Sequence, residues 1–137
     1  MTIANSDRFP GAPDADAMEA MARRSLESLP PEFLREMGNV VLRVVEYADR
    51  ESLAAVGLTH PMQLSGLYTG RPVGEKSVSD PAAMPDIIHL YRAPILAEAA
   101  QRAISVERLV HHVLIHEVGH HFGLSDADMH ALEDEAG

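Results

Sequence analysis

The sequence predicts an α+β fold, with a small mixed β-sheet packed on a central buried helix and additional helices at the N-terminal end. Three observations indicate this fold. Apolar residues recur at helical spacing after Asp14, a valine-rich run follows at 39–47, and a long apolar segment ends at Gly123. With 137 residues, the chain has the length of one domain with one hydrophobic core. We expect residues 1–13 to be a flexible lead-in and residues 14–137 to form that domain.

The N-terminal helices are predicted from their end signals. Asp14 can cap a helix that Pro30 and Pro31 terminate. Within it, helical spacing relates Met18, Met21, Ala22, Ser25, Leu26 and Leu29. Pro31 can open a second, short helix over Glu32–Met37, which Gly38 closes.

The strands are predicted from β-rich composition and alternation. Asn39–Tyr47 is nearly apolar on both faces, which indicates an interior strand. Asp86–Arg92 alternates, with His89 and Tyr91 on one face and Ile88 and Leu90 on the other. Glycines and prolines divide residues 48–83 into turns, with a short strand at Leu64–Tyr68.

The C-terminal part is predicted to be helical. A short helix over Ile95–Arg102 follows Pro94, and Ser105 can cap a long helix that runs to about Phe122. Apolar residues spread over most of the circumference of the long helix, so we expect it to be buried. A last short helix begins near Ser125.

The composition excludes several classes of function. The chain has no cysteine, which excludes disulfides, thiolate metal ligands and a cysteine nucleophile. Its formal charge of -10 disfavours a nucleic-acid partner, because such binding depends on Lys and Arg at phosphates. It has no apolar run long enough to span a bilayer and no signal-peptide pattern at its start. We therefore expect a cytoplasmic protein with no membrane partner.

The histidines are concentrated, since five of the eight fall within residues 111–121. His116 and His120 are four residues apart, so on a helix both imidazoles project from one face and can bind one ion at about 2.0–2.1 Å. Glu117 can flank that ion without binding it and accept a proton from a zinc-activated water. This pattern, H-E-x-x-H, predicts a Zn²⁺ site for hydrolysis with Glu117 as the catalytic base.

A third protein ligand would leave the fourth position on zinc open. Gly123 permits a sharp turn that returns Asp126 to the metal, giving H-E-x-x-H-x-x-G-x-x-D. His130, and after it Glu133, are the alternatives to Asp126. The remaining histidines at 111, 112 and 121 are assigned to the surface or to positions behind the ligands, although His112 can line the cleft. Nickel or cobalt can bind to the same nitrogen and oxygen ligands.

The extended motif resembles the metzincin pattern, with aspartate in place of the usual third histidine. Three segments, 66–70 (GLYTG), 85–92 (PDIIHLYR) and 116–129 (HEVGHHFGLSDADM), resemble the small bacterial zincin-like metallopeptidases over residues 39–130. The resemblance implies a zincin-like α+β fold and a minimal protease acting on a peptide or protein. It also implies zinc on His116, His120 and Asp126, with Glu117 as general base.

Details of the cleft and two alternative functions follow from the same residues. We expect Asp86–Arg92 to form the cleft rim and pair with an extended peptide, and His89, Tyr91 or His112 to stabilise the oxyanion.

Metzincins place a methionine turn well downstream of the third ligand, but only eleven residues follow Asp126 here. One alternative is therefore a non-catalytic, zinc-stabilised binding module on a degenerate zincin fold. The other is a metal-dependent endoribonuclease, a class that generally lacks a glutamate at the position of Glu117.

Overall fold

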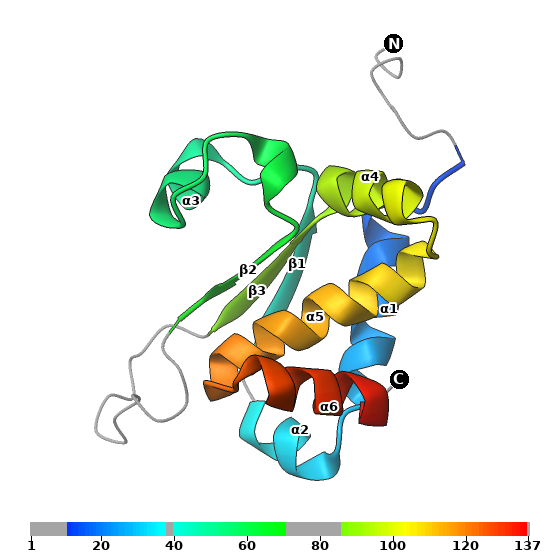
Figure 1. Ribbon diagram of the computed structural model, residues 1–137, viewed down its shortest axis with the longest axis vertical. Helices are drawn as coiled ribbons and strands as arrows, with labels where there is room; N and C mark the ends of the chain where they lie inside the picture. The colour runs from blue at the N-terminus through cyan, green and yellow to red at the C-terminus, as the bar shows by residue number, and fades with distance from the viewer. Residues whose placement is uncertain (1–10, 38–39, 71–85, 137) are drawn as a thin grey trace.

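The computed structural model describes residues 11–37, 40–70 and 86–136. These residues form an α+β fold of helices and one small sheet (Figure 1). In chain order they are α1 (Ala15–Glu27), α2 (Pro31–Met37), β1 (Val41–Val45), α3 (Arg50–Ala55), η2 (Pro61–Gln63), β2 (Gly66–Thr69), β3 (Ile87–Tyr91), α4 (Arg92–Arg102), α5 (Val106–Phe122) and α6 (Asp126–Ala136). The predicted fold class is confirmed. Most of the expected lead-in at 1–13, and Gly38, lie outside the described residues.

The three strands form one mixed sheet in the order β1-β3-β2. β1 runs parallel to β3 with Val41 opposite Ile87, and β2 runs antiparallel to β3 with Gly66 opposite Leu90. Two predictions are wrong. The apolar segment 39–47 supplies an outer strand, with Val45 39% exposed, and the interior strand is β3. Because both edges of β3 are already paired, it cannot be the cleft rim that binds an extended peptide.

Helices α1 and α5 cover one face of the sheet. α1 packs on β1, α5 packs on β2 and β3, and the two helices contact each other (Figure 1). The main core lies between these layers, and its buried members include Met18, Ala22, Leu42, Ile88, Leu90, Leu109, Leu114, Ile115 and Val118. The predicted burial of the long helix is confirmed.

A second, smaller apolar cluster lies around Tyr91. Tyr91 is 2% exposed and packs with Leu53 of α3 and with Leu67 of β2. The alternation expected for residues 86–92 therefore holds, with Ile88 and Leu90 in the main core. Each face of β3 meets its own apolar cluster, which accounts for its interior position.

The helix ends follow their predicted caps. Asp14 Oδ1 accepts from the backbone N–H of Ala17 at 2.8 Å, and Ser105 Oγ accepts from that of Arg108 at 3.1 Å. α4 begins at Arg92, earlier than predicted, because Pro94 is tolerated in the first turn, where backbone N–H groups have no intrahelical partner. In the described ranges, no helix is long and apolar enough to cross a membrane.

Candidate metal centre

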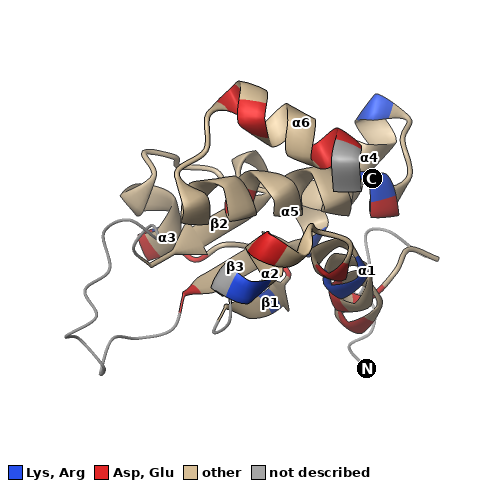
Figure 2. Cartoon of the chain, turned by 90° about the horizontal axis from the view of Figure 1, so that it is seen from below, with Lys and Arg blue, Asp and Glu red and all other residues tan. Residues whose placement is uncertain are grey.

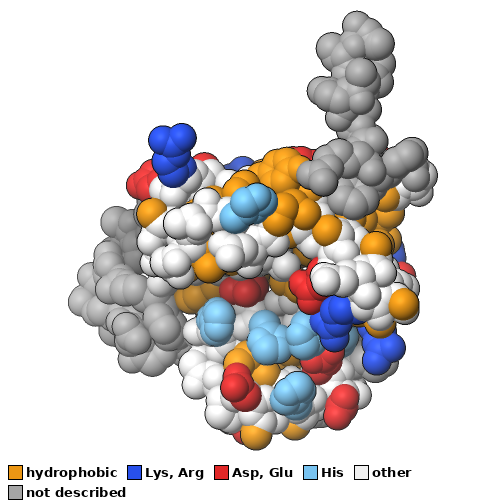
Figure 3. Space-filling model, turned by 45° about the horizontal axis from the view of Figure 1, so that its top comes forward, with side chains coloured by type: hydrophobic (Ala, Val, Ile, Leu, Met, Phe, Trp, Pro, Cys, Tyr) orange, Lys and Arg blue, Asp and Glu red, His pale blue; other side chains and the backbone are white. Residues whose placement is uncertain are grey.

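Helix α5 presents the H-E-x-x-H motif near its C-terminal end. Gly123 follows in the left-handed conformation, with φ of 67°, and ends the helix as predicted. His116 is half-buried, whereas the side chain of His120 is 56% exposed. Figure 3 shows histidine side chains gathered around a hollow on one face, with carboxylate side chains among them.

Glu117 is buried beside strand β2, and its side chain is only 9% exposed. Gly66 makes this approach possible, because a Cβ at position 66 would lie 3.3 Å from Glu117 Cγ and 2.7 Å from Val113 Cγ1. The Glu117 carboxylate accepts a hydrogen bond from the backbone N–H of Tyr68, and its Oε1 lies 3.2 Å from Nδ1 of His120. These contacts fix the carboxylate between β2 and His120.

The protonation of Glu117 reflects this burial. Desolvation raises the pKa of the Glu117 carboxyl above its ordinary value, while His120 and the Tyr68 N–H act in the opposite direction. A raised pKa makes the carboxylate a better proton acceptor near neutral pH. The position of Glu117 is therefore suited to general acid–base chemistry.

His116 is held near its neutral form. Burial lowers the pKa of His116, and the neighbouring His112 lowers it further. The carboxylates of Glu133 and Asp126 oppose this effect, which places both acidic residues within electrostatic range of His116. Neutral imidazole is the form that binds metal ions.

Helix α6 brings its acidic residues to α5. A Cβ on Gly119 would lie 2.2 Å from Met129 Sδ, so the two helices pack closely at that point. Asp126 lies about one turn before Met129 and Glu133 about one turn after it, on the same side of α6. Figure 2 shows acidic residues and no Lys or Arg along this helix.

Among the described residues, one group of three or more potential ligands has its atoms within 4.8 Å of one another, and it consists of His112, His116 and Glu133. His112 Nδ1 lies 2.9 Å from Glu133 Oε1 and 3.1 Å from Oε2. His120 and Asp126 do not join this group at that separation, and His130 is exposed. The ligand set His116, His120 and Asp126 therefore stays a prediction. The imidazole and carboxylate donors of both sets fit a zinc ion.

His121 forms a buried pair with Asp86, a contact that the local sequence does not predict. Its Nδ1 lies 2.9 Å from Asp86 Oδ2, and both side chains are almost fully buried, at 1% and 2% exposure. Its ring also contacts Tyr68 edge-on, with centroids 5.6 Å apart. A Cβ on Gly70 would clash with Asp86, so a glycine is required where β2 ends. His121 thus joins α5 to the start of β3 behind the motif.

The three residues considered for the oxyanion lie on different sides of the sheet. Tyr91 belongs to the second apolar cluster, where Ser52 hydrogen-bonds its hydroxyl. His89 stacks on Tyr91, with the ring planes 4° apart. His112 instead lies on α5 with its ring centroid 4.5 Å from that of His116. Of the three, His112 is the one placed beside a motif histidine.

Comparison with protein families agrees with this geometry. The model of the family described as zincin-like metallopeptidase matches residues 37–136. This chain belongs to the zincin-like metallopeptidase family. No curated protein matches the chain. The family match of this zincin-like protein spans all three strands and α3 to α6, while α1 lies outside it and yet supplies Met18 and Ala22 to the core.

Proposed function

We propose that this protein is a zinc-dependent peptidase in which Glu117 is the general base and His116, His120 and Asp126 hold the ion. The observation that carries the proposal is the buried Glu117 carboxylate, fixed beside the helical histidine pair by the Tyr68 N–H and by His120. Family membership supports metal-dependent peptide hydrolysis as the reaction class. When bound, zinc supplies Lewis acidity, polarising an amide carbonyl and activating a water molecule.

In this mechanism Glu117 moves the proton. The carboxylate accepts it from the attacking water and then passes it to the nitrogen of the leaving amine. Burial favours both transfers, because it raises the carboxyl pKa toward the working pH. The Tyr68 N–H holds the carboxylate in place through both steps.

A peptide or protein is the proposed substrate, and β2 is the proposed binding strand. Among the described strands, β2 pairs with β3 along one edge only, and Tyr68 on β2 reaches Glu117 through its backbone N–H. An extended peptide that pairs with the edge of β2 away from β3, beyond the Tyr68 N–H already bound to Glu117, would therefore run next to Glu117. On this proposal, the strand that pairs with the substrate is 66–69 instead of 86–92.

The test is Glu117→Gln in the zinc-loaded protein, assayed on a fluorogenic peptide library. We expect zinc content to stay near that of the wild type while hydrolysis falls by about 10²–10⁴-fold, the usual contribution of a general base. Glu107→Gln is the matched control, because Glu107 lies on the same helix with a side chain 58% exposed. Hydrolysis that survives Glu117→Gln would contradict the role of this carboxylate.

The same experiment distinguishes the non-catalytic alternative. Wild-type protein that binds zinc, gains thermal stability from it and hydrolyses no member of the library would support a zinc-stabilised binding module. Hydrolysis that depends on Glu117 would exclude that alternative.

A further inference from the structure

Three histidines on α5 form a continuous stripe. His112, His116 and His120 are each four residues apart, so they lie one above another on one side of the helix. The carboxylates of α6 flank this stripe at two levels. Glu133 contacts His112, while Asp126 lies two helical turns away from Glu133. His116 is thus the middle residue of the stripe, between the levels of the Glu133 and Asp126 carboxylates.

Near His112, the stripe and α6 bring together three side chains that could hold a metal ion. The ligand atoms of His112, His116 and Glu133 lie within 4.8 Å of one another. Two ligand atoms bound to a tetrahedral zinc ion at about 2.0–2.2 Å are about 3.3–3.6 Å apart, and His112 Nδ1 lies 2.9 Å from Glu133 Oε1. The group as a whole is more open than this, at up to 4.8 Å, so the side chains would close on an ion as it binds.

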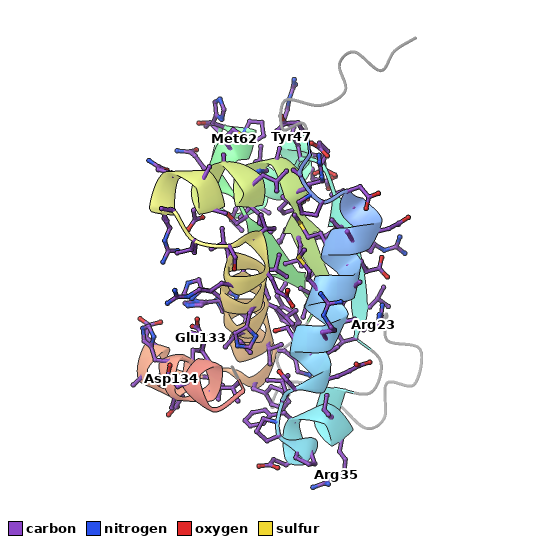
Figure 4. All side chains as sticks on the ribbon, turned by 90° about the vertical axis from the view of Figure 1, so that its right-hand side faces the viewer. Arg23, Arg35, Tyr47, Met62, Glu133 and Asp134 are labelled. Carbon is purple, nitrogen blue, oxygen red and sulfur yellow. The ribbon has the colours of Figure 1, made fainter. Side chains whose placement is uncertain are left out.

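The surroundings of these three residues also suit a bound ion. The side chain of His112 is 31% exposed and that of Glu133 is 24% exposed, so an ion could enter from solvent while remaining partly shielded. Figure 4 shows Glu133 on α6 where this helix lies beside α5. Two imidazoles and one carboxylate favour zinc or a similar borderline ion over calcium or magnesium, which prefer oxygen ligands alone.

We propose that His112, His116 and Glu133 form a second site for a divalent ion such as Zn²⁺, and that this site competes for His116 with the catalytic site. The competition rests on the proposed function, whereas binding of an ion by these three residues does not. His116 can bind through only one of the two sites at a time, because each site uses it as a ligand. The bound ion therefore divides between the two sites according to their affinities, and protein with the ion at the second site does not hydrolyse peptide.

The binding arm of the test uses the full chain with His120→Ala and Asp126→Ala, which removes the catalytic set and keeps the second. Titration with Co²⁺, followed by its visible absorption, should show about one bound equivalent. Adding Glu133→Gln should weaken cobalt binding by more than about tenfold, and adding His112→Ala should do the same. His60→Ala is the control, because His60 is an exposed histidine outside α5, α6 and the group.

Cobalt affinity that does not change with Glu133→Gln or His112→Ala would overturn the second site. Glutamine keeps the shape of Glu133 and can still accept from His112, and far-UV circular dichroism of the metal-free variants verifies their fold. If the double variant does not fold, His120→Gln alone replaces it, since the His120 side chain is 56% exposed.

The activity arm tests the competition separately. At saturating Zn²⁺, the Glu133→Gln variant should hydrolyse peptide faster than the wild type, because it cannot hold the ion at the second site. Equal or slower hydrolysis by Glu133→Gln would contradict the competition, even where cobalt binds as expected. A wild type with no hydrolysis under any zinc concentration would refute the proposed function, and the cobalt titration would still decide the second site.

Discussion

Gly119 and Met129 hold the two helices of the candidate metal centre in direct contact. A Cβ on Gly119 would lie 2.2 Å from Met129 Sδ and 2.5 Å from its Cγ, and Met129 is only 4% exposed. Gly119 is the residue before His120, so the methionine packs at the level of the motif. The missing side chain at position 119 therefore sets how closely the carboxylates of α6 approach the histidines.

The first prediction concerns Gly119→Ala. Helix propensity alone would favour alanine by about 1 kcal/mol, but inserting a methyl group into this contact costs about 1–3 kcal/mol. We expect a net loss of free energy of unfolding of up to about 2 kcal/mol in the metal-free protein, measured by urea denaturation. Displacement of α6 should also weaken zinc binding.

A double-mutant cycle with Met129→Ala separates this contact from other effects. Because the shortened side chain leaves room for the new methyl group, Gly119→Ala should cost less in the Met129→Ala background. The same cost in both backgrounds would show that Met129 is not what excludes a side chain at position 119.

The second prediction tests Asp126 as the third ligand. In the Glu133→Gln background, which removes the second site, Asp126→Ala should weaken zinc retention in competition with a chromophoric chelator, because the catalytic set would lose its oxygen donor. Asp128→Ala is the matched control, since Asp128 also lies in the first turn of α6 and is also exposed. Equal zinc retention by the two variants would move the third ligand to another residue.

The helices were predictable from sequence because their signals are local. Asp14 and Ser105 cap the helices that follow them, and Gly123 ends α5 through its left-handed conformation. The position of each strand in the sheet was not predictable, because it depends on which distant segments pair. Asn39–Tyr47 is the more apolar segment, yet the packing of Tyr91 against α3 gives the interior position to β3.

Some residues of the candidate site could likewise be predicted from local sequence, and others could not. His116, Glu117 and His120 follow from one helical motif, so sequence alone identifies them. The contact between His112 and Glu133 joins residues 21 positions apart on two helices, and no local pattern encodes it. One signal was available for His112, which precedes His116 by one helical turn. The buried pair of His121 and Asp86 had no comparable signal, because it joins a helix end to a strand start.

The third prediction concerns His89, whose ring Nδ1 is buried and has no hydrogen-bond partner among the described residues. Burial lowers the pKa of His89, Arg43 lowers it further and Asp49 opposes them, so the folded pKa lies below the unfolded value of 6.5. The unfolded state therefore binds a proton first as the pH falls through 6.5, and the wild type loses stability in that range.

His89→Phe keeps a ring beside Tyr91 and does not titrate. In metal-free protein, urea denaturation between about pH 5 and pH 7.5 should show the wild type losing stability relative to His89→Phe as the pH falls. His130→Gln, at an exposed histidine, controls for the loss of one imidazole. A stability difference between wild type and His89→Phe that does not vary with pH would mean that His89 titrates alike in the folded and unfolded states.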